Sequence, residues 1–149
     1  MSQLSLSVLA FVGGIFLAAQ GTYNAQLGVQ LKNPLLASAL AFFFSTVFAL
    51  VIVLFTMKDL PSRETIRQIP IYLWFTGGLF CVLGISLYYY TIPKLGVSTM
   101  ISIGLCGQLV FAVIAGHFGW FNFPSDPINL KRVIGLISMI TGVLLINLK

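Results

Sequence analysis

The chain has 149 residues, of which 58% are hydrophobic and only 7% are charged. Soluble domains carry about a quarter charged residues, so this composition excludes a soluble enzyme or binding domain and indicates an integral membrane protein. The net charge of +5 lies in short connections, which leaves no folded basic surface for a nucleic acid.

Long apolar runs fill almost the whole chain. A bilayer core about 30 Å thick needs about 20 consecutive apolar residues for each helical span. The runs that meet this requirement are residues 4–28, 35–57, 71–92, 97–115 and 133–148. The sequence therefore predicts an all-α, polytopic membrane protein, a five-helix bundle that forms a single transmembrane domain over residues 1–149. We expect the first run to be a retained span, because its opening MSQLSLS lacks the positive charge of a signal peptide.

The connections between the runs carry the charged residues and indicate the orientation. When alternate connections are assigned to alternate sides, more basic residues fall on the side of the N-terminus. That side receives Lys58, Arg63, Arg67, Lys131 and Arg132, and the other receives Lys32, Lys94 and Lys149. The positive-inside rule then favours a cytoplasmic N-terminus and a periplasmic C-terminus. Because the bias is small, insertion in both orientations is left open.

The first run contains amide side chains where lipid-facing residues would be expected. At about 100° per residue, Gly13, Gln20, Gly21, Asn24 and Gly28 share one helical face. An amide that faced lipid would lack a hydrogen-bond partner, so this face is predicted to point into the bundle. Either the amides join helices, at about 0.6 to 2 kcal/mol each, or they line a solute pathway in which the glycines permit bending or close passage.

The third and fourth runs add small and polar groups and favour the pathway interpretation. Gly77, Gly84 and Tyr88 share one face of the third run. In the fourth, Gly104 and Gly107 precede an amide and weaken the helix at mid-depth, where discontinuous helices build transport sites. The predicted pathway residues are Gln20, Asn24, Tyr88 and Gln108.

The fifth run carries Gly135 and Gly142 on one stripe. Small residues at helical spacing let another helix approach closely, so this stripe is predicted to be a packing or dimer face.

The inventory of reactive side chains argues against catalysis. The chain has one histidine and two cysteines, and no acidic residue lies inside the apolar runs. This set offers neither an acid–base pair nor a metal-binding cluster. We therefore expect no enzymatic activity, no metal and no cofactor.

Several short motifs follow one another along the chain: G-G-x5-Q-G-x2-N-x3-G at residues 13–28, IPKLGVS at 92–98, GQL at 107–109, HFGW at 117–120 and KRVIGL at 131–136. In this order they resemble the YdcZ family, a five-span branch of the drug/metabolite transporter (DMT) superfamily. The resemblance implies a bacterial inner-membrane exporter of a small organic solute that works by alternating access. It also implies a fold equal to half of a ten-helix inverted-repeat transporter, completed by an antiparallel homodimer or an oppositely oriented paralogue.

The sequence also departs from related transporters. Gly116 stands where the resemblance leads us to expect an acid, which leaves His117 as the only titratable group near the fourth run. The glutamate of the four-span multidrug relatives is absent, and Gln20 and Asn24 occupy comparable positions. Because an amide cannot titrate, a neutral, zwitterionic or aromatic solute fits better than proton–cation exchange. A non-transporting membrane assembly protein and a passive channel remain alternatives.

Overall fold

The computed structural model describes residues 2–122 and 124–148. Lys149, one of the basic residues that indicate the orientation, lies outside the described residues. The described part of the chain contains helices and no strand. The elements are α1 (Gln3–Gln30), α2 (Pro34–Thr56), α3 (Arg63–Gln68), η1 (Ile71–Trp74), α4 (Thr76–Leu95), α5 (Val97–Phe118), η2 (Trp120–Asn122) and α6 (Leu130–Asn147). Among the described residues, five helical segments are long and apolar enough to cross a membrane. The predicted all-α class with five spans is confirmed.

The third membrane-spanning segment differs from its predicted form at both ends. It begins with the short 3-10 helix η1 and continues as α4, which runs through Pro93 to Leu95. Pro93 has no N–H to donate to the carbonyl of Tyr89, so one backbone hydrogen bond is missing, and the helix ends two residues later. The expected connection at 93–96 therefore shrinks to Gly96, whose φ of 87° favours a residue without a β-carbon.

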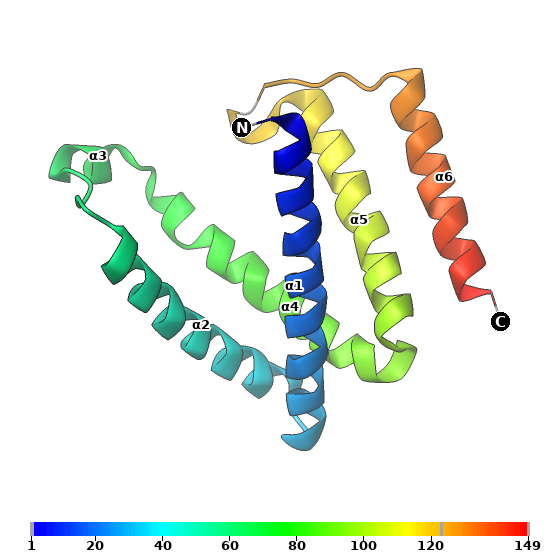
Figure 1. Ribbon diagram of the computed structural model, residues 1–149, viewed down its shortest axis with the longest axis horizontal. Helices are drawn as coiled ribbons and strands as arrows, with labels where there is room; N and C mark the ends of the chain where they lie inside the picture. Colours follow the sequence, from blue (N-terminus) through cyan, green and yellow to red (C-terminus); the bar gives the residue numbers. More distant parts are fainter. Residues whose placement is uncertain (1, 123, 149) are drawn as a thin grey trace. The chain divides into compact units, whose positions relative to one another are not determined.

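The chain divides into two compact units, Met1–Lys94 and Leu95–Lys149, and each is described by itself. The first unit contains α1, α2, α3, η1 and α4, and the second contains α5, η2 and α6 (Figure 1). That the whole chain forms a single transmembrane domain stays a prediction.

A tight turn joins α1 to α2 in the first unit. Lys32 adopts a left-handed φ of 51°, and the Asn33 N–H donates to the carbonyl of Gly28 at 3.0 Å, the pattern of a Schellman helix end. Asn33 then caps α2, because its side-chain oxygen accepts from the N–H groups of Leu35 and Leu36 at 3.0 and 3.1 Å. The turn thus fixes α1 and α2 side by side.

The buried residues of the first unit gather toward this turn. A β-carbon on Gly28 would lie 3.4 Å from Pro34 Cα and 3.5 Å from Ala37 Cβ, so α1 and α2 are in close contact there. Away from the turn, Figure 1 shows α2 and α4 diverging from α1, and most of their side chains there are exposed. The tightly packed part of this unit is therefore one end of its helices.

In the second unit, α5 and α6 pack against each other and are tied near both ends. Near one end, the Asn147 amide donates to the Ser102 hydroxyl at 3.0 Å. Near the other, the Asp126 N–H donates to the carbonyl of Gly116 at 2.8 Å. The connection after α5 therefore folds back onto the end of that helix.

We predict that Gly28→Leu destabilises the first unit by about 1 to 3 kcal/mol, because the larger side chain overpacks the contact with α2. Gly28→Ala should be tolerated, since its β-carbon makes contacts of ordinary length. The measurement is the thermal unfolding midpoint in detergent. Gly14→Leu is the matched control, because no described atom lies within 4 Å of a β-carbon there. Equal effects at both glycines would contradict the packing of this turn.

Candidate functional site

A network of uncharged polar side chains connects α1 to α4. The Asn24 amide donates to the Tyr89 hydroxyl at 2.9 Å and to Gln20 Oε1 at 3.2 Å. The Tyr89 hydroxyl in turn donates to Gln20 Oε1 at 3.5 Å. Tyr89 is only 2% exposed, and both amides are half-buried. The two amides one turn apart on α1 thus meet a buried hydroxyl from α4.

A groove of about 800 Å³ lies beside this network in the first unit. Its wall includes Gln20 and Tyr89 from the network, exposed aromatic rings, and the Ser45 hydroxyl. Among the described residues that line it, none carries a formal charge. The lining residues are Gly13, Phe16, Leu17, Ala19, Gln20, Tyr23, Ala41, Phe42, Ser45, Cys81, Ile85 and Tyr89. The groove therefore combines an apolar, aromatic wall with a few uncharged hydrogen-bonding groups, the composition typical of small-molecule sites.

Buried residues, among them Ser38, Ser86 and Ile92, lie between the groove and the α1–α2 turn, and we call them the closed layer. The Ser38 hydroxyl of α2 donates to the carbonyl of Leu35 at 2.9 Å and lies 2.8 Å from the Ser86 hydroxyl of α4. Because the single proton of Ser38 is already donated, Ser86 is the donor in the contact between the helices. Gly21 admits the Ile92 side chain, which would lie 3.8 Å from a β-carbon on that glycine.

A smaller hollow of about 160 Å³ lies beyond this layer, close to the α1–α2 turn. It is lined by Gly28, Val29, Pro34, Tyr89, Tyr90, Pro93 and Lys94. The Lys94 ammonium lies 3.6 Å from the centre of the Tyr90 ring, a cation–π contact at the end of α4. Tyr89 therefore lines both the groove and the smaller hollow.

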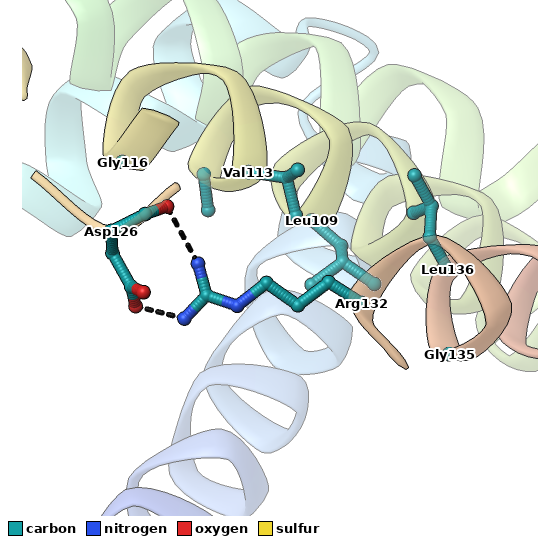
Figure 2. Close-up of a pocket in the computed structure, with 8 residues that line it drawn as sticks. Leu109, Val113, Gly116, Asp126, Arg132, Gly135 and Leu136 are labelled. Atoms are coloured by element: carbon teal, nitrogen blue, oxygen red, sulfur yellow. Dashed lines mark hydrogen bonds and ion pairs between the residues drawn. The ribbon is translucent and has the colours of Figure 1, made fainter. Parts of the chain in front are cut away.

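The second unit has a hollow of its own, of about 370 Å³, between α5 and α6 (Figure 2). The Arg132 guanidinium donates to the backbone oxygen and to the carboxylate of Asp126, and both contacts are drawn in Figure 2. Close by, His117 Nδ1 accepts from the Ile128 N–H at 3.2 Å. The charged and titratable groups here hold the connection onto the ends of the helices, a structural role that explains their positions.

Gln20 and Asn24 are brought together by the structure. Tyr88 lies on α4, half-buried, and is outside the groove lining. Gln108 lies on α5, in the second unit. For all four residues, a role in a solute pathway stays a prediction.

Tyr89 is the residue that the sequence analysis did not select, because it chose Tyr88 from the three consecutive tyrosines as the pathway residue. The face of α4 that lies toward the groove and the closed layer carries Cys81, Ile85, Tyr89 and Ile92. The spacing of these positions fits one helical face as well as the spacing of the predicted face, which carries Gly77, Gly84 and Tyr88. A search for a face with both an apolar stripe and a hydroxyl would have kept Tyr89 as a candidate.

The predicted packing and hinge glycines have different environments. Gly21 and Gly28 are buried between helices, and Gly13 lines the groove. At Gly77, Gly84, Gly107, Gly135 and Gly142, no described atom lies within 4 Å of a β-carbon. α5 passes through Gly104 and Gly107 without a break, since a glycine costs a helix only about 1 kcal/mol.

The family assignment rests on nearly the whole chain. A family model described as "Putative inner membrane exporter, YdcZ" matches residues 5–145. The chain belongs to the YdcZ family. Neither the curated proteins nor the solved structures gave a match. Family membership and five apolar helices together make the chain a multi-pass inner-membrane protein of the transporter class, and the resemblance seen in the motifs is confirmed.

We predict that the Ser38–Ser86 contact stabilises the packing of α2 on α4 by about 0.6 kcal/mol and at most about 1.7 kcal/mol. Ser38→Ala should cost more than Ser86→Ala, because it leaves the buried Ser86 hydroxyl without its acceptor. A double-mutant cycle measured by unfolding in detergent gives the coupling energy.

Thr46→Val is the control for this cycle, because the Thr46 hydroxyl donates to the carbonyl of Phe42 in its own helix at 2.8 Å. It should show no coupling to Ser86→Ala. Strictly additive effects of the two serine substitutions would contradict a hydrogen bond between α2 and α4.

Proposed function

We propose that the chain exports a small, uncharged organic solute by alternating access and that the groove of the first unit is part of the solute pathway. The observation that carries this proposal is the groove of about 800 Å³ with Gln20 and Tyr89 in its wall. This volume lies within the range of about 300 to 1,000 Å³ common for small-molecule sites. Membership in an exporter family supplies the class of function.

The chemistry of the groove indicates which solutes it would accept. Its rings, among them Phe16, Tyr23 and Phe42, offer contact area to an apolar or aromatic body. Amide and hydroxyl groups offer hydrogen bonds but no compensating charge, and an unpaired ion in such a site would be strongly disfavoured. A neutral solute with a hydrogen-bonding group suits this wall best, and a zwitterion that satisfies its own charges is the next choice.

Alternating access by a five-helix chain calls for a second set of helices of opposite orientation. We propose an antiparallel homodimer, or a pair with an oppositely oriented paralogue, in which the predicted packing stripe of Gly135 and Gly142 contributes to the contact. Support comes from the weak charge bias of the connections and from the open space beside Gly142, where no described atom of another element lies within 4 Å of a β-carbon.

We predict that Gln20→Leu abolishes export and leaves expression unchanged, and that Gln108→Leu has the same effect. Leucine removes the hydrogen bonds to solute and keeps the helix, because leucine is a strong helix former. The measurement is efflux of a panel of uncharged aromatic solutes from cells that express the chain. Gln26→Leu is the matched control, since this amide lies on an exposed part of α1. Full efflux by the Gln20 and Gln108 variants would show that these amides only join helices.

The proposed pairing predicts where the C-terminus lies. Two reporters are fused to it in parallel, one active only in the cytoplasm and one only in the periplasm. Strong signal from both is the result expected for an antiparallel homodimer. Signal from the periplasmic reporter alone would contradict the homodimer and direct the search to an oppositely oriented partner chain.

A further inference from the structure

Tyr89 occupies the boundary between two hollows of the first unit. On the groove side, it is joined in the lining by Gln20 and Cys81. On the side of the α1–α2 turn, it is joined by Val29, Pro34 and Lys94 in the lining of the smaller hollow. The tyrosine itself is only 2% exposed, so its ring is part of the layer that keeps the two hollows apart.

The rest of that layer consists of small or tightly held residues. Ser38 and Ser86 are buried and hydrogen-bonded to each other, Ala25 and Ala37 are small, and the buried Ile92 side chain packs against Gly21. Tyr89 is the largest fully buried side chain among the described residues. A passage from one hollow to the other would therefore open most widely if this one ring moved.

The backbone at Tyr89 is weaker than that of an ordinary helix. Pro93 lies four residues further along α4 and has no N–H, so the helical hydrogen bond from residue 93 to the carbonyl of Tyr89 cannot form. Bends in membrane helices occur at such positions. One backbone hydrogen bond fewer therefore opposes a shift of the segment that carries the ring.

The Tyr89 hydroxyl is held by two amides, and one of them, Gln20, also lines the groove. It accepts from Asn24 at 2.9 Å and donates to Gln20 Oε1 at 3.5 Å. Gln20 lines the groove, so a solute that forms a hydrogen bond with this amide competes with the tyrosine for it. Arrival of a solute in the groove would weaken the bonds that hold the ring in place.

From these contacts we propose that Tyr89 is a gate between the groove and the side of the membrane on which the α1–α2 turn lies, held closed by Asn24 and Gln20 and free to move because of Pro93. The inference rests on the proposed function, since it gives one step of alternating access a specific side chain. It predicts that the groove is closed toward the α1–α2 turn while Tyr89 is in place.

Cysteine labelling tests this gate without any solute. Cys81 lines the groove and is exposed, and Cys106→Ala removes the cysteine of the second unit. Lys32→Cys in the α1–α2 turn reports the orientation of each molecule, because a large impermeant maleimide that reaches it shifts the band on a gel. A small impermeant thiol reagent is then applied from the same side, and modification of Cys81 is measured in the shifted band only.

In the wild-type background, Cys81 should react slowly from the side of the α1–α2 turn. Tyr89→Ala should speed this reaction about tenfold or more, because loss of the ring should raise the fraction of open molecules by about one order of magnitude. Tyr89→Phe keeps the ring and loses its hydrogen bonds. It should speed the reaction about fivefold, because the net contribution of one hydrogen bond changes an equilibrium constant by about that factor. Leu87→Ala is the control and should leave the rate unchanged, because this side chain is exposed and lines neither hollow.

The gate is overturned if Cys81 already reacts quickly from the turn side in the wild-type background, or if the Tyr89→Ala and Leu87→Ala variants react alike. If Tyr89→Ala does not fold, as judged by size-exclusion chromatography, the rate for Tyr89→Phe decides. The labelling needs no transported solute, so the two proposals fail separately. Absence of export with the expected labelling would reject the transport function alone, and export with unchanged labelling would reject the gate alone.

Discussion

An amide placed at depth in a membrane helix must find a hydrogen-bond partner within the protein, and the first unit is organised around this constraint. Asn24 meets it through Tyr89 and Gln20, at 2.9 and 3.2 Å. This contact draws α4 onto α1 close to the turn where α2 is already packed. The groove, the closed layer and the smaller hollow all lie around that meeting point, because the helices diverge away from it.

Periodicity was enough to predict the class of fold and the inward face of α1. The apolar runs differ from the observed helices by a few residues at their ends, and the amides at 20 and 24 are half-buried and hydrogen-bonded. The rotation of α4 could not be predicted in the same way. Three consecutive tyrosines, Tyr88 to Tyr90, cover about 200° of a helix, so spacing alone cannot choose among them. Contacts from other helices, such as Ser38 to Ser86, decide the choice.

The glycines illustrate the same limit of sequence interpretation. A stripe of small residues marks where another helix can approach, but it does not say which helix does so. Gly28 is packed against the helix that follows it in the chain, whereas Gly84 and Gly142 have open space beside them. Proximity along the chain explains the first case, since a short turn brings α1 and α2 together. The open stripes are compatible with contacts made by other helices, which a single chain's sequence cannot specify.

The absence of charge from the groove wall constrains how transport could be driven. Among the described residues that line the groove, none is an acid, a base or a histidine, so the wall itself cannot take up a proton in exchange for solute. His117 and Asp126, in the second unit, are engaged in holding the connection to the end of α5. In the proposed transport cycle, coupling at this groove would act on the equilibrium between open and closed forms. A side chain such as Tyr89, held by neutral hydrogen bonds of modest strength, suits that arrangement because a bound solute can replace those bonds with its own.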